Sequence, residues 1–307
     1  MFTHLRVASG YSFKYGTASA AQLVERAVEH GAQALALTDR DGMAGAIRFV
    51  QECESAGIAP ILGVNLSFLQ KKYRITLLAQ TGSLPALYRL LSAVNKESSA
   101  ERLLTFEILE KYSHYSSQLL AMHGPDSYLA SAITARRENE ALSIFNSARD
   151  LFADQAIEVI SHRVKDDGPF STPYAAKLLK FARRSDIPAV ITNAVRMLDR
   201  TDGPVADVLD SARLLVPLHQ RHVERRNSEG YLKSSAEMSL MADEIARAAG
   251  EFDGRLLLRT TAQWAGDPTV KLPVPTFGAI SVAIGSTSTV ELSCVAKLFG
   301  CSRFSLI

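Results

Sequence analysis

Residues 34–45 read ALALTDRDGMAG, and this stretch decides the fold. Four apolar residues run without interruption into a polar Thr-Asp pair, which is the pattern of a buried parallel strand that feeds a loop. Apolar residues at helical spacing precede it at 19–30 and follow it at 46–57, and residues 59–62 (APIL) supply the next apolar run. Short apolar strands that alternate with helices predict right-handed βαβ units around a mostly parallel sheet.

Outside this unit the alternation continues less regularly. We expect further strands at residues 5–7, 73–79, 118–122, 156–160 and 187–192. We expect further helices at residues 84–94, 173–184, 204–215 and 231–249, the last with Ser234 and Glu237 at capping-box spacing. A chain of 307 residues with this alternation is long for an ordinary domain but common for a single α/β barrel.

The composition supports a folded chain and argues against autonomous DNA binding. Hydrophobic residues make up 47% and charged residues 21%, so a substantial core can form. The formal net charge is only +2, whereas a domain that holds DNA tightly by itself usually shows a stronger basic bias. We therefore expect DNA to be contacted weakly or with the help of a partner.

The cysteines and the apolar runs indicate the compartment. Cys53, Cys294 and Cys301 form neither a disulfide framework nor a CxxC metal clip, so reduced thiols are expected. The first residues lack a signal-peptide pattern, and no apolar run approaches the ~18 residues of a membrane helix. We expect a cytoplasmic protein with no membrane contact.

The character of the sequence changes after Asp267. Pro273 and Pro275 interrupt the chain, and residues 278–290 are rich in small and hydroxyl side chains without an amphipathic period. We expect one domain at residues 1–267, followed by an irregular or truncated tail at 268–307. A mobile extension and a segment foreign to the domain are the alternatives.

Polar side chains stand at the ends of four expected strands. They fall at residues 4–9, 38–42, 63–65 and 192–196. In α/β barrels the carboxyl ends of the strands carry the functional groups. We expect the functional side chains to be found at these four places.

These four strand ends resemble motifs of the PHP (polymerase and histidinol phosphatase) family. The motifs read HLRVASGYS at 4–12, LALTDRDGMAG at 35–45, PILGVNL at 60–66 and IPAVITNAVRML at 187–198. Further strings resemble the N-terminal PHP domain of bacterial DNA polymerase III alpha subunits, actinobacterial ones in particular; they lie at 75–95, 203–218 and 230–238. The resemblance implies an α/β fold, a distorted PHP-type (β/α)7 barrel with a short C-terminal extension.

The resemblance also implies which positions hold metals in intact family members. Such sites use histidine and carboxylate ligands to bind up to three divalent ions, Zn, Mn or Mg, for phosphoester hydrolysis. In this chain most of those positions carry other side chains: Arg6, Ala8, Arg40, Asn65, Ala194 and Arg196. Alanine cannot ligate, and arginine stays protonated and only donates hydrogen bonds. A guanidinium would also repel the ions, so we expect a degenerate site with no catalytic residue and no cofactor.

Three residues with ligating side chains remain among the former site positions. They are Asp39, His123 and His162, and together with His4, which flanks the first motif, they are the candidates for residual metal binding. We expect His123 and His162 to stand at strand ends facing the site. Two histidines without carboxylate support make a poor phosphoesterase.

The arginines at the former ligand positions have two alternative roles. If the strand order holds, Arg6, Arg40 and Arg196 converge on one pocket. They would either pair with Asp39 and Asp41 in a metal-free structural cluster or keep a concavity that binds anions. Asp39 would cap the loop or pair with Arg6 or Arg40.

The polymerase family carries its catalytic aspartates in a palm domain that follows the PHP domain, and nothing here resembles that Asp-x-Asp pair. Although the family's reaction is DNA-directed DNA polymerisation, a nucleotidyltransferase reaction, we do not expect this chain alone to perform it. The interpretation we favour is the N-terminal PHP scaffold of a DNA polymerase III alpha-type subunit in DNA replication or repair synthesis. Its expected partners are the polymerase core and other replication subunits. The alternatives are a stand-alone PHP metal-dependent phosphoesterase or 3′–5′ exonuclease, and a non-catalytic binding module from a truncated gene.

Overall fold

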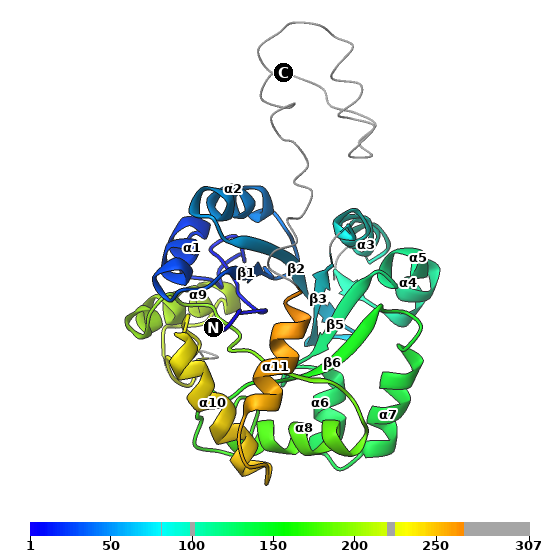
Figure 1. The fold of residues 1–307 in the computed structure, drawn as a ribbon. Helices are drawn as coiled ribbons and strands as arrows, with labels where there is room; N and C mark the ends of the chain where they lie inside the picture. Colours follow the sequence, from blue (N-terminus) through cyan, green and yellow to red (C-terminus); the bar gives the residue numbers. More distant parts are fainter. Residues whose placement is uncertain (81, 99–101, 220–224, 267–307) are drawn as a thin grey trace, which may run out of the picture. The chain divides into compact units, whose positions relative to one another are not determined.

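The structure, a computed structural model, describes residues 1–80, 82–98, 102–219 and 225–266 (Figure 1). The α/β barrel predicted from the sequence is confirmed in this part of the chain. The expected tail at residues 268–307 lies outside the described residues, and so do Cys294 and Cys301. Cys53 is buried and has a free thiol.

One curled sheet forms the centre of the fold. Its neighbouring strands are, in order, β1 (Ala34–Leu37), β2 (Ala59–Phe68), β3 (Gln70–Ala79), β5 (Leu119–His123), β6 (Asp154–Val159) and β7 (Ala189–Ile191), and the short β4 (Leu103–Leu104) pairs with β2. β3 runs antiparallel to β2 and β5, and the other pairs are parallel.

The amino-terminal segment closes the sheet into a barrel. On one side the Thr38 amide donates to the Val7 carbonyl at 2.8 Å, which attaches the segment to the end of β1. On the other side the Val195 amide donates to the Arg6 carbonyl at 2.9 Å, and the Ala8 amide donates to the Val195 carbonyl at 2.8 Å. Residues 5–7 form only an isolated bridge, Val7 to Val195, and not the regular strand predicted from the sequence.

Helices surround this sheet (Figure 1). They are α1 (Ala20–Glu29), α2 (Ala46–Ala56), α3 (Leu84–Glu97), α4 (Phe106–Lys111), α5 (Ser113–Ser116), α6 (Tyr128–Thr134), α7 (Glu138–Ser147), α8 (Thr172–Arg184), the 3-10 turn η1 (Arg200–Asp202), α9 (Gly203–Leu214), α10 (Ser235–Ala248) and α11 (Arg255–Trp264). The capping box expected at Ser234 is present, and a capping box at Ser19 begins α1. No helix in the described ranges is long and apolar enough to cross a membrane.

Side chains on the two faces of each strand pack into separate parts of the apolar core. Leu5, Leu78, Leu120 and Met122 are among the residues that pack together inside the barrel. Residues on the opposite strand faces, such as Ala121, pack in separate clusters with the helices. Strand residues two apart share a face, so this division decides which strand-end side chains reach the mouth of the barrel.

The antiparallel part of the sheet is larger than the sequence predicts. The strand expected at 59–62 continues to Phe68, and the strand expected at 73–79 begins at Gln70, so the two form a hairpin around Leu69. Leu69 takes a positive φ of 62°, a conformation in which glycine or asparagine is the usual signal. The expectation of a mostly parallel sheet therefore holds except at β3.

Candidate functional site

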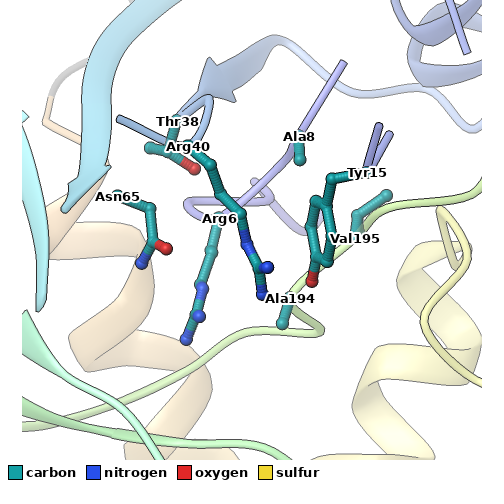
Figure 2. A pocket seen from close by; sticks show the side chains of 8 residues that line it. All are labelled: Arg6, Ala8, Tyr15, Thr38, Arg40, Asn65, Ala194 and Val195. Carbon is teal, nitrogen blue, oxygen red and sulfur yellow. The ribbon is translucent and has the colours of Figure 1, made fainter. Parts of the chain in front are cut away.

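A small cavity lies at the mouth of the barrel, where the four motif-bearing strand ends meet. Its lining consists of Arg6, Ala8, Tyr15, Thr38, Arg40, Asn65, Ala194 and Val195 (Figure 2). The cavity measures about 10 Å³, which is the room that one water molecule needs. Five positions that the resemblance marked as a former metal site therefore surround one small space.

Arg6 lies among buried carboxylates at this mouth. Its guanidinium donates to Asp126 at 2.5 and 3.1 Å and to Glu158 at 2.8 Å. Glu158 is fully buried, and its second oxygen accepts a hydrogen bond from Thr192 at 2.5 Å. Burial alone would lower the pKa of Arg6, but Asp126 and Glu158 outweigh it and raise that pKa. Arg6 is thus a permanent positive charge held between two acids from β6 and the loop after β5.

The two acids respond differently to this arrangement. Burial raises the pKa of the Glu158 carboxyl, and Arg6 opposes that effect only in part. Burial also acts to raise the pKa of Asp126, but Arg6 outweighs it and the net shift is downward. Asp126 therefore carries the negative charge that pairs with Arg6, while Glu158 is the carboxyl most ready to hold a proton.

Arg40 and Arg196 are held by the ring of Tyr15. The guanidinium carbon of Arg40 lies 3.4 Å and that of Arg196 lies 4.1 Å from the ring centroid (Figure 2 shows Arg40 over the ring). Arg196 is also anchored from behind, because it donates to both oxygens of Asp210 at 2.9 and 3.0 Å. Burial acts to raise the pKa of Tyr15, but Arg40 and Arg196 outweigh it and lower that pKa. The stack fixes two positive charges beside the cavity.

Asn65, which stands in place of a glutamate ligand, belongs to a polar cluster on β2 and β3. It donates to Thr76 at 2.9 Å and accepts from the guanidinium of Arg74. Arg74 also donates to Asp41 at 2.8 Å. Asp41, which was predicted to pair with the arginines at the former ligand positions, is thus paired with Arg74, a β3 arginine that the sequence did not indicate.

Asp39 accepts hydrogen bonds from the loop that leads to Tyr15. It accepts from the Ser9 amide at 2.7 Å, from the Ser9 hydroxyl at 3.0 and 3.1 Å, and from the Ser12 hydroxyl at 2.7 Å. Burial raises its pKa, although these hydrogen bonds oppose the shift. Of the two roles expected for Asp39, these hydrogen bonds match loop capping, which orders the segment that carries Tyr15.

The histidines do not gather at the cavity. His123 shares the outward face of β5 with Ala121, and its Nε2 donates to Gln155 at 2.9 Å, so the expectation that it faces the site is wrong. His4 donates to the Lys233 carbonyl at 2.8 Å and does not line the cavity. His162 does approach the mouth: it donates to the Asn193 carbonyl at 2.8 Å and stacks on Phe170. Burial lowers the pKa of each of the three to about 4.

A wider cleft of about 470 Å³ adjoins the small cavity. Tyr15, Arg40 and Ala194 line both spaces, whereas Arg196 and His162 line only the cleft. Eight Arg and Lys side chains among the described residues line it: Arg40, Lys71, Lys72, Arg74, Arg196, Arg213, Arg225 and Arg226. Asp126 is the one acidic residue in the described part of its lining, so we call this space the basic cleft.

The side chains at the mouth do not fit the divalent metals of intact PHP sites. Within the described residues, no group of three or more His, Cys, Asp or Glu side chains is placed to hold a metal ion. The acids nearest the cavity, Asp126 and Glu158, are already paired with Arg6. An ion there would have to displace a guanidinium and would meet further positive charge from Arg40.

Several residues of this site were not predicted from the sequence. Asp126, Glu158 and Asp210 supply the counter-charges, and Tyr15 and Arg74 fix the positions of the arginines and of Asn65. Asp126 follows a strand in the string HGPD, a signal that could have been used. Glu158 gave no such signal, because an acid inside an apolar strand is recognised only once its partner is known.

Comparison with known proteins places these features in a family context. Residues 4–162 match the family model described as PHP domain. The error-prone DNA polymerase of Symbiobacterium thermophilum is 32% identical over 251 residues, which cover 76% of this chain and 23% of that protein. The DNA polymerase III subunit alpha of Treponema pallidum is 28% identical over 260 residues, which cover 78% of this chain and 21% of that protein. The chain spans about a fifth of the length of these curated relatives.

The solved structures that match this chain are more distant. An amidohydrolase from Chromobacterium violaceum, solved with bound sulfate and no metal, has a TM-score of 0.44 and 14% identity; the match covers 64% of this chain and 88% of that one. A putative metal-dependent phosphoesterase from Bifidobacterium adolescentis has a TM-score of 0.39 and 15% identity, covering 62% of this chain and 86% of that one.

Proposed function

This chain belongs to the PHP domain family and is related to bacterial DNA polymerase III alpha subunits and error-prone DNA polymerases, and from that premise we propose that it is a non-catalytic PHP scaffold of a polymerase of this kind. In this role the domain, residues 1–267, supports a polymerase core in DNA replication or repair synthesis. The polymerase core and other replication subunits are its partners in the cytoplasm, and the chain itself neither hydrolyses phosphoesters nor polymerises nucleotides.

One observation carries the proposal: an arginine lies among the acids of the barrel mouth. Arg6 stands at a histidine position of the family motif and donates to Asp126 and Glu158. Metal-dependent hydrolysis needs ions that generate hydroxide and neutralise the charge of the phosphate. A guanidinium supplies positive charge, but it cannot lower the pKa of a bound water as a metal ion does.

The same contacts suit a structural role. The Arg6 pairs join the amino-terminal segment to β6 and to the loop after β5, and the pair of Arg196 with Asp210 joins the segment after β7 to α9. Removing one partner from a buried pair is strongly destabilising, because the remaining charge is left without compensation. The mouth is therefore held in one arrangement without metal, which is what a scaffold that has lost its ligands requires.

A reconstitution experiment tests this proposal. The purified chain is mixed with a polymerase of its own organism from which the PHP region has been removed, and complex formation and primer extension are measured. We expect a stoichiometric complex and better primer extension than the truncated polymerase shows alone. Absence of a complex, together with metal-dependent hydrolysis of bis-para-nitrophenyl phosphate by the chain alone, would replace the scaffold by the phosphoesterase alternative.

A further inference from the structure

The basic cleft concentrates positive charge far beyond the chain average. The whole chain carries a net charge of +2, yet eight Arg and Lys side chains and a single Asp are found in the part of this lining that the structure describes. Four carboxylates, those of Asp41, Asp166, Asp207 and Asp210, pair with lining arginines without themselves lining the cleft. Among the described residues of the lining and its ion-pair partners, eight cations thus stand beside five acids.

Some of these cations are fixed in place. Arg196 is bidentate to Asp210, and Arg225 donates to both oxygens of Asp207, at 2.7 and 2.5 Å. Their positions are set before any ligand arrives, so the reorganisation needed on binding is small. Within a concave, partly buried space they create a potential that attracts anions.

Other cations are free to change partner. The ion pair of Arg226 with Asp166 is about half exposed on both sides, and exposed pairs of this kind contribute little stability. Lys72 is exposed, and its ammonium lies 4.6 Å from the centroid of the Tyr73 ring. Arg226 and Lys72 can therefore turn towards a bound anion at little cost, and a guanidinium matches two phosphate oxygens at once.

The cleft also has a wall that is not charged. Val164, Pro169, Phe170 and Met197 line it beside His162, which stacks on Phe170 at a centroid distance of 5.0 Å. The volume of about 470 Å³ lies within the range of about 300–1,000 Å³ that is usual for small-molecule sites. A lining that combines aromatic and aliphatic side chains with several cations suits an anion that carries an organic group as well as charge.

We propose that the basic cleft binds an anion with two or more phosphate groups, and that it does so without a metal ion. More than one phosphate is required because the cations come from separate elements: β3 contributes Lys72, the segment after α9 contributes Arg226, and the Tyr15 stack contributes Arg40. A nucleoside polyphosphate and a short run of single-stranded nucleic-acid backbone share this chemistry. The site is independent of the scaffold role and can be tested apart from it.

Binding is measured on the full chain in EDTA, so that metal ions cannot contribute. The probes are sodium tripolyphosphate, dATP and a fluorescently labelled single-stranded oligothymidylate, and the methods are calorimetry and fluorescence anisotropy. The double variant Lys72→Glu/Arg226→Glu reverses two exposed charges of the cleft. Arg255→Glu is the matched control, because Arg255 is highly exposed on α11 and does not line the cleft.

We expect at least one probe to bind, with affinity lowered about tenfold or more in the double variant and changed by less than about twofold in Arg255→Glu. Thermal unfolding of each variant confirms that it is folded. Equal binding of tripolyphosphate and dATP identifies the polyphosphate as the ligand group, and binding of the oligonucleotide alone identifies the nucleic-acid backbone; both support the site. Three results would overturn the proposal: no probe binds in EDTA, binding requires added Zn²⁺ or Mn²⁺, or the double variant binds as tightly as the unaltered chain.

Discussion

Replacing Arg6 by methionine tests the electrostatic account of the barrel mouth. Arg6 and Glu158 are buried, and Asp126 is mostly buried. The substitution keeps most of the side-chain volume but leaves both carboxylates without their counter-charge. Breaking a buried pair in this way costs about 3–5 kcal/mol, whereas an exposed pair contributes at most about 1 kcal/mol. We therefore expect Arg6→Met to lower the free energy of unfolding by about 3–5 kcal/mol.

The loss can be measured by urea unfolding and by the melting temperature. For a domain of this size about 1 kcal/mol shifts the melting temperature by about 2–4 °C, so the melting temperature should fall by roughly 6–20 °C. Arg184→Met is the matched control, because the Arg184 pair with Glu138 is exposed on both sides. That variant should stay within about 1 kcal/mol of the unaltered chain.

Two further measurements separate lost charge from lost packing. In Arg6→Met the unpaired Glu158 should have a folded pKa above its unfolded value, so the defect is largest above that pKa and shrinks as the pH falls through it. Adding Glu158→Gln should recover part of the loss at neutral pH, because the amide removes the buried charge. The reasoning is refuted if Arg6→Met loses no more stability than Arg184→Met, or if Glu158→Gln recovers none of the loss.

Three other predictions concern Asp39, Tyr15 and the buried histidines. Asp39→Ala should lower the free energy of unfolding by about 2–4 kcal/mol, and more than Asp39→Asn does, because the hydrogen bonds from Ser9 and Ser12 are made to a charged acceptor; equal losses in urea unfolding would argue against this. Tyr15→Leu should cost about 1–3 kcal/mol through the loss of the ring between Arg40 and Arg196, while Tyr15→Phe should stay near neutral in the same assay. The pKa values of three buried histidines, His4, His123 and His162, are about 4 in the fold, against a usual value of 6.5. Between pH 4 and pH 6.5 the unfolded chain therefore binds more protons than the folded chain, so stability should fall as the pH drops from 6.5 to 4. His123→Gln should flatten that pH dependence by at most about 3 kcal/mol, and an unchanged profile would show that His123 is not buried in its neutral form.

Local patterns in the sequence predicted much of the fold. The apolar run at Ala34–Leu37 is β1, and the Ser234 cap begins α10 as expected. These features depend on residues within one turn or one strand of each other, so the sequence shows them directly. The hairpin at Leu69 was missed because its turn residue takes a positive φ without being glycine or asparagine.

The site was predicted less completely, since its contacts join distant parts of the chain. The motifs placed Arg6, Ala8, Arg40, Asn65 and Ala194 at strand ends, and the structure brings these residues around one cavity. That these positions correspond to the metal-ligand positions of the family stays a prediction. The partners of the arginines were not predicted, because Arg6 and Glu158 are 152 residues apart and spacing does not tell which acid meets which base.

His123 shows why a strand end alone does not place a side chain at the site. It was predicted to face the site because it ends an apolar strand. Alternation along β5 puts His123 on the face of Ala121, opposite Met122, which lies inside the barrel. The register of the strand was needed to decide between the two faces, and that register comes from pairing with β3.

The central claim, that a guanidinium-filled barrel mouth has replaced a metal-dependent site, is tested most directly by measuring bound metal and hydrolysis together. The purified chain is incubated with Zn²⁺, Mn²⁺ or Mg²⁺, desalted, and examined by elemental mass spectrometry and by hydrolysis of bis-para-nitrophenyl phosphate. We predict well under one metal ion per chain and no hydrolysis above the background. Stoichiometric zinc or manganese, with hydrolysis that is lost in His162→Ala and retained in His4→Ala, would contradict the account.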